Sequence, residues 1–108
     1  MQTDPLKTLE LKPLIIEAIS KVYDPEIPVN IYELGLIYDI DVNSENVVQV
    51  NMTLTSPACP SAQALPLEVE RRVREVPGVA TAKVDVVWEP TWTMEKMSEE
   101  AKLQMGLL

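Results

Sequence analysis

The chain has 108 residues, enough for one domain, and a net charge of −8. This acidic balance disfavours nucleic acid and anionic membranes as partners, because both bind proteins through Lys and Arg. No apolar stretch approaches the ~20 residues that cross a bilayer, and residues 1–5 lack the basic and apolar regions of a signal peptide. With one cysteine and no histidine, the composition favours a reducing cytoplasm.

A first helix is predicted to begin at Pro13, because proline suits the first helical turn, where its missing N–H is not needed. Residues 1–12 are accordingly expected to be loosely ordered. Apolar residues follow at the spacing of one buried helix face, at Ile15, Ala18, Ile19 and Val22. The helix is expected to stop before Pro25, which disfavours helical geometry at the preceding residue.

Residues 24–35 form a predicted loop that contains two prolines. Within it, Asn30 has the spacing of a helix N-cap three residues before Glu33. Gly35 suits the left-handed end of such a short helical turn.

Alternating apolar and polar residues predict two half-buried strands, over residues 38–42 and 48–54. The polar residues 43–46 between them predict a hairpin. A third strand is predicted where Val84, Val86 and Trp88 alternate with other residues.

A second helix is predicted over about residues 60–76, kinked or delayed by Pro66 and ended by a Pro-Gly pair. Ser98 is predicted to cap a short last helix. The order helix–strand–strand–helix–strand–helix predicts a single domain over residues 1–108, a two-layer α/β fold with a small mixed three-stranded sheet packed with helices. The expected core contains Ile15, Ile19, Val50, Met52, Leu65, Val69, Val84 and Val86.

Cys59 lies where the second strand gives way to the second helix, in the sequence Thr-Leu-Thr-Ser-Pro-Ala-Cys-Pro. With Pro60 as the first helical residue, Cys59 is the N-cap. We expect the backbone N–H groups and the helix dipole to lower the thiol pKa below ~8.5, which favours the thiolate that binds metal or attacks. The alternative is a small buried apolar residue without chemistry, as free cysteines often are.

Oxygen-bearing side chains are candidates to support this thiol. Asp24 and Glu26 flank a proline just after the first helix, and their carboxylates can complete a metal site or act as a base. The alternative is a turn residue at Asp24 and a solvated Glu26. Thr53, Thr55 and Ser56 precede the thiol, and their hydroxyls can bond a thiolate or cap the helix, with capping the expected role for at least one of the three.

The segment Trp-Glu-Pro-Thr-Trp over residues 88–92 follows the third strand. Such a pair of tryptophans usually fixes an irregular tail onto a domain, and we expect this of Trp88. Two roles stay open for Trp92, fixing the tail and forming a surface that binds a partner. Trp92 is our candidate residue for such a partner surface. Methionines in the tail favour such an adaptable surface, at Met94, Met97 and Met105.

Three segments together carry a family resemblance: Tyr-Asp-Pro-Glu-Ile-Pro-Val-Asn from residue 23, the segment around Cys59, and residues 88–92 before a Gly-Leu-Leu end. From about residue 12 onward the chain resembles the small SufT-like family of iron–sulfur (SUF system) assembly accessory proteins. The resemblance implies a compact α/β fold and a non-enzymatic role in maturing iron–sulfur proteins. It also implies that Cys59 is the functional, metal-binding thiol, with Asp24 and Glu26 nearby.

The partners implied are the iron–sulfur assembly machinery and client apo-proteins. A cluster usually needs four thiolates, whereas a monomer offers one and a homodimer two. Any bound cluster is therefore expected to be transient and shared between chains or with a partner, and none is expected to be required for folding. The alternatives are a protein adaptor with a structural cysteine and a thiol enzyme, which the absence of histidine weakens.

Overall fold

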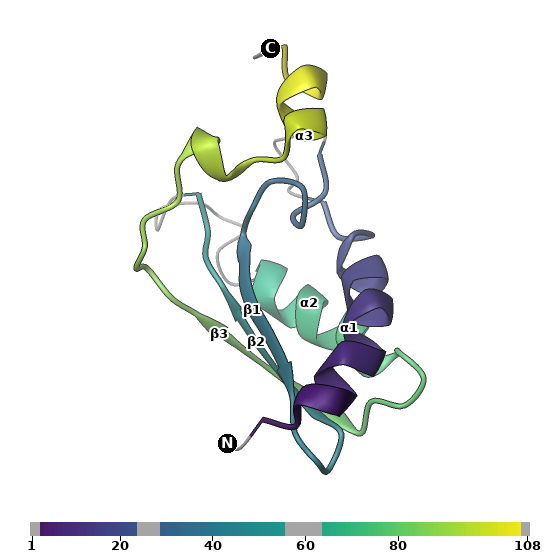
Figure 1. Cartoon of the computed structure of the whole chain (residues 1–108). Helices are drawn as coiled ribbons and strands as arrows, with labels where there is room; N and C mark the ends of the chain where they lie inside the picture. The colour runs from purple at the N-terminus through teal and green to yellow at the C-terminus, as the bar shows by residue number, and fades with distance from the viewer. Residues whose placement is uncertain (1–2, 24–28, 56–63, 107–108) are drawn as a thin grey trace.

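The computed structural model describes residues 3–23, 29–55 and 64–106 of the chain. The predicted α/β fold and its element order are confirmed (Figure 1). The elements are helix α1 (Pro5–Ile19), strands β1 (Ile37–Val42) and β2 (Val47–Met52), helix α2 (Ala64–Arg74), strand β3 (Thr81–Val86), a 3₁₀ turn η2 (Met94–Lys96) and helix α3 (Glu99–Gln104).

The sheet has the order β1-β2-β3, with β1 and β2 antiparallel and β2 and β3 parallel. The predicted hairpin joins β1 to β2, and Asn46 in it takes the left-handed conformation with φ of 62°. Parallel strands need a crossover connection, which here includes α2. Both α1 and α2 pack on one face of the sheet (Figure 1). The other face carries polar side chains such as Gln49, Asn51 and Asp85.

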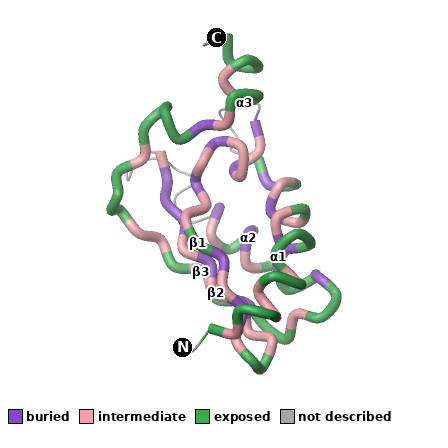
Figure 2. Tube along the Cα trace, viewed as in Figure 1, coloured by how far each residue is buried: buried purple, intermediate pink, exposed green. Residues whose placement is uncertain are grey.

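The core lies between this sheet and the two helices, as the purple positions of Figure 2 show. Six of the eight predicted core residues are buried: Ile15, Ile19, Val50, Met52, Leu65 and Val69. Val84 and Val86 pack against the core but are half-buried.

The predicted start of the first helix is wrong. The helix begins at Pro5 instead of Pro13, and Asp4 is its N-cap, with a carboxylate oxygen that accepts hydrogen bonds from the N–H groups of Leu6 and Lys7. Pro13 lies inside the helix. The early turns gave no periodic signal, because their outward residues Leu6 and Leu9 are themselves apolar and 76% and 75% exposed.

The short turn before β1 forms as predicted. The Asn30 carboxamide oxygen accepts a hydrogen bond from the Glu33 N–H at 2.9 Å. Gly35 has φ of +80°, and a Cβ placed there would lie 2.2 Å from the backbone oxygen of Lys96. Glycine is needed here for two reasons, the left-handed backbone and the close approach of the tail.

The tail over residues 87–106 is held against this turn. The Ser98 N–H donates to the Glu33 carbonyl at 2.9 Å, and the Ser98 hydroxyl caps α3 as predicted by accepting from the Ala101 N–H at 3.1 Å. Met97 is buried in the core, so the placement of this methionine on a partner surface is wrong. Met94 and Met105 remain exposed.

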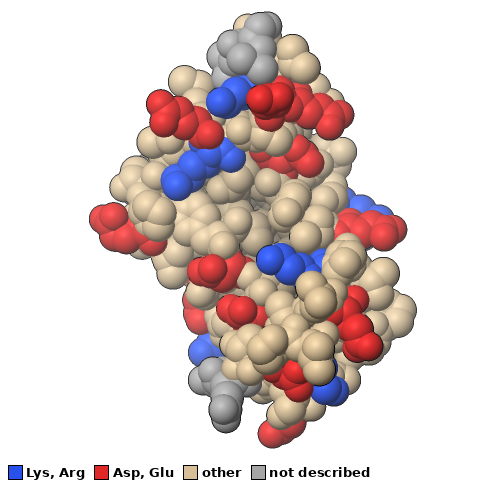
Figure 3. Space-filling view, viewed as in Figure 1, with Lys and Arg blue, Asp and Glu red and all other residues tan. Residues whose placement is uncertain are grey.

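None of the helices within residues 3–23, 29–55 and 64–106 is long and apolar enough to cross a membrane. On the face drawn in Figure 3, acidic side chains are spread over the surface with basic ones among them, and no broad basic patch gathers there.

Candidate functional site

The parallel pairing of β2 with β3 determines where the candidate site forms. Met52 and Val86 are register partners at the ends of these strands, and the Val87 N–H continues the pairing by donating to the Met52 carbonyl at 2.8 Å. The residues that follow β2 and those that follow β3 therefore leave the sheet side by side at the same edge. Carboxyl ends of parallel strands are where α/β proteins place their binding crevices.

A hollow of about 400 Å³ lies at this edge, and we call it the indole hollow. It brings together two of the motifs singled out in the sequence, the threonine segment before Cys59 and the tryptophan segment after β3. Sequence reasoning missed Glu89 and Thr91 as part of it, although both stand inside the tryptophan motif. The lining residues are Thr53, Leu54, Thr55, Trp88, Glu89, Thr91 and Trp92.

Thr53 is the buried polar residue of this site, with 1% of its surface exposed. Its N–H donates to the Leu36 carbonyl at 2.8 Å, which ties the end of β2 to the turn before β1. Its hydroxyl oxygen is fully buried and has no hydrogen-bond partner among the described residues. A buried hydroxyl without a partner is unfavourable. Helix capping was expected of at least one of Thr53, Thr55 and Ser56; within the described residues neither Thr53 nor Thr55 caps a helix, and Ser56 lies outside these residues.

Tyr38 contacts the tryptophan segment that lines the hollow. Its hydroxyl donates to the Pro90 carbonyl at 2.6 Å and so fixes the tryptophan segment. Burial raises the pKa of Tyr38 above its usual value, and the negative charge of Glu89 adds to this rise. The phenol is protonated at neutral pH and donates the hydrogen bond.

The roles of the two tryptophans differ from those expected. Trp92, not Trp88, fixes the tail: its indole Nε1–H donates to the Leu34 carbonyl at 2.7 Å and its ring packs against the core. Trp88 is 45% exposed. A partner-surface role for Trp92 stays a prediction, and it applies to the part of the ring that faces the indole hollow.

Cys59, Asp24 and Glu26 lie outside the described residues. The flanks of the segment with the two carboxylates are described: Tyr23 and Asn30 form an antiparallel bridge, and the Ile31 N–H donates to the Val22 carbonyl at 2.9 Å. The Leu36 N–H donates to Ile31, and Leu36 in turn accepts from Thr53. The turn over residues 30–36 thus contacts the described flanks of both predicted functional segments.

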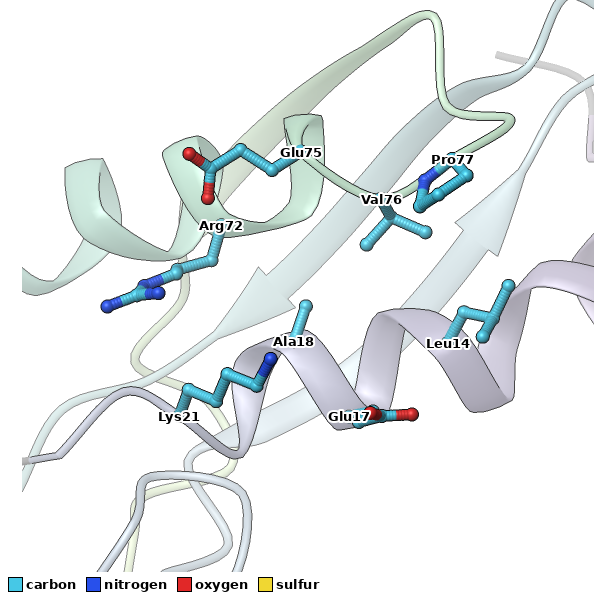
Figure 4. Close-up of a pocket in the computed structure, with 8 residues that line it drawn as sticks. All are labelled: Leu14, Glu17, Ala18, Lys21, Arg72, Glu75, Val76 and Pro77. Atoms are coloured by element: carbon cyan, nitrogen blue, oxygen red, sulfur yellow. The ribbon is translucent and has the colours of Figure 1, made fainter.

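Two other hollows contain none of the predicted site residues. Figure 4 shows the one between α1 and α2, of about 180 Å³, where Lys21 and Arg72 stand with Glu17 and Glu75. These opposite charges largely compensate one another. The second, of about 650 Å³, lies beside the indole hollow and shares Glu89 with it.

The described residues contain no group of three or more acidic side chains placed to hold a metal ion. The donor set expected for a cluster is one thiolate and the carboxylates of Asp24 and Glu26. This set fits iron but cannot complete a four-thiolate centre from one chain.

Comparison with known proteins identifies the family. A family model described as iron–sulfur cluster assembly protein matches residues 13–86, and the chain belongs to this family. An Fe-S protein maturation auxiliary factor of Porphyromonas gingivalis is 49% identical over 94 residues, covering 87% of this chain and 90% of that protein. The Bacillus subtilis Fe-S protein maturation auxiliary factor YitW is 41% identical over 97 residues, covering 90% and 95%.

A solved structure shows the same fold. The crystal structure of a domain of unknown function, DUF59, from Bacillus anthracis matches with a TM-score of 0.89 and 33% identity, over 97% of this chain and 100% of that chain. The family expected from the sequence and the fold expected from the element order are both confirmed.

Proposed function

We propose that this protein is an accessory factor in the maturation of iron–sulfur proteins, and that it acts without enzymatic turnover through the Cys59 thiol. Membership of the iron–sulfur cluster assembly family supports the pathway, as do relatives that are named maturation auxiliary factors. The observation that carries the site is the indole hollow at the carboxyl ends of β2 and β3.

In the sequence, Cys59 follows Thr55, which lines this hollow, by four residues. A soft thiolate is a ligand that iron–sulfur clusters prefer. The cluster is the cargo, taken up and released with ligands from a second copy, a partner or a small thiol, and the carboxylates of Asp24 and Glu26 are candidates for additional ligands.

A pure adaptor is the second candidate, in which the cysteine is structural and the protein acts through contacts. Exposed residues in the tail favour it, because Trp88 is 45% and Met94 57% exposed. In either case the partners are components of the assembly machinery and client apo-proteins, and we place the protein in the cytoplasm.

Replacing Cys59 by Ser separates these two candidates. Serine keeps the size and the capping ability but removes the soft ligand, so the fold is expected to survive and maturation to fail. The measurement is the activity of a cluster-dependent enzyme in cells that lack this protein, complemented with either form. Circular dichroism of both purified forms controls for folding. Equal complementation would show that the thiol is structural and would favour the adaptor.

A further inference from the structure

The described residues that line the indole hollow offer partners for a cation and carry no positive charge. Its lining offers two aromatic rings, three threonine side chains and one carboxylate, and no Lys or Arg is among the residues that form it. Glu89 is exposed and forms no ion pair with a described residue. Lys96, a nearby cation, lies 5.1 Å from the centre of the Tyr38 ring and lines the adjacent hollow instead.

Both tryptophan side chains line the indole hollow. The Trp92 indole N–H is already bonded to Leu34, so what this side chain can still offer a ligand is its π surface. Trp88 is 45% exposed beside it. A cation over an indole face is attracted by the ring quadrupole, most strongly when partly desolvated.

We propose that the indole hollow binds an arginine side chain of a partner protein. A guanidinium is planar, stacks on aromatic faces and carries five donors for carboxylate and hydroxyl acceptors. In this arrangement the guanidinium lies against Trp88 and Trp92 and pairs with Glu89. That the partner belongs to the assembly machinery or is a client rests on the proposed function.

Other ligand classes fit less well. Phosphate or carboxylate groups are repelled by Glu89 and by the net charge of −8. An apolar side chain offers no charge or hydrogen-bond donor to the Glu89 carboxylate. A lysine ammonium is a strongly hydrated point charge and cannot stack on the rings.

The test is a titration of the 15N-labelled full chain with the peptide acetyl-Gly-Arg-Gly-amide, followed by the two indole N–H signals in NMR spectra. Peptides with citrulline or lysine in place of arginine are the matched probes, since citrulline keeps the shape and removes the charge. We expect saturable shifts of both indole signals with the arginine peptide, and weaker binding of the other two.

Two variants test whether the arginine peptide binds at the indole hollow. Glu89→Gln should weaken binding of the arginine peptide by about twofold to fivefold, as expected for loss of an ion pair at an exposed carboxylate. Glu45→Gln, an equal charge change in the exposed hairpin, should leave it unchanged.

The proposal is overturned if the indole signals do not shift saturably, if citrulline or lysine binds as tightly as arginine, or if Glu45→Gln weakens binding as much as Glu89→Gln. The titration involves neither Cys59 nor a cluster. Its failure would therefore leave the complementation result for Cys59 intact, and the reverse also holds.

Discussion

Tyr38 shows how a single residue links the sheet to the site. The pairing register between β1 and β2 shifts between Ile37 and Asp39, so Tyr38 stands at a β-bulge. Such bulges redirect side chains at the edges of sheets and next to functional sites. Here the side chain meets the Pro90 carbonyl instead of joining the core.

Replacing Tyr38 by Phe removes this hydrogen bond and is expected to lower the free energy of unfolding by about 1 kcal/mol at neutral pH. Because the pKa of Tyr38 is raised in the folded protein, its contribution is fully present below its unfolded pKa of about 10 and falls as pH rises through the folded value. The difference between the two forms should therefore shrink above pH 10. Urea unfolding from pH 7 upward measures it, and a difference that grows with pH would contradict the assignment.

The bulge also explains why the exposure of Tyr38 could not be predicted from the sequence. Alternation of apolar residues placed Tyr38 with Ile40 and Val42 on one inward face. Ile40 and Val42 are buried, but Tyr38 is not, because an inserted residue breaks the two-residue period. Glu89 was missed for a related reason: its place in the hollow depends on the pairing of β2 with β3, which no local pattern specifies.

At the scale of elements, start and stop signals predicted most of the fold. Asn30, Gly35 and Ser98 act as expected, since caps depend on side chains a few residues away. The start of α1 was missed because Asp4 with Pro5 and Pro13 are competing start signals, and a proline inside a helix is usually unfavourable. Which of them begins the helix depends on packing against the sheet.

The contact between the turn and the tail gives a test for Gly35. A Gly35→Ala change strains a left-handed backbone and brings a methyl group against the Lys96 carbonyl, so a loss of about 2–4 kcal/mol in the free energy of unfolding is expected. Gly106→Ala is the matched control, because its φ is +75° but, apart from its chain neighbours, no atom of the described residues lies within 4 Å of the added Cβ.

The control should cost about 1 kcal/mol, from the backbone strain alone. Chemical denaturation of both variants supplies the comparison. Equal losses at the two positions would mean that the close approach of the tail to Gly35 contributes nothing to stability.

At the scale of the whole molecule, the number of thiolates per chain predicts how a cluster-loaded form would be assembled. Four thiolates are usual for a cluster, and each chain provides one. A cluster-loaded form is therefore built from more than one chain, or from one chain with external ligands.

Light scattering on the protein before and after anaerobic reconstitution with iron and sulfide should show a larger species after reconstitution. The Cys59→Ser form, treated in the same way, should keep its original size. A cluster-loaded monomer formed without added thiol would refute this account of the ligands.

The pairing of Trp88 with Trp92 in one hollow has an optical consequence. They are the two tryptophans of the chain, so all of its intrinsic indole fluorescence originates at the candidate site. Iron–sulfur clusters absorb light in the range where indoles emit, and a cluster delivered near the hollow would quench that emission by energy transfer. The protein thus carries an unlabelled reporter, and stopped-flow fluorescence can test the proposed function by timing the arrival and departure of a cluster.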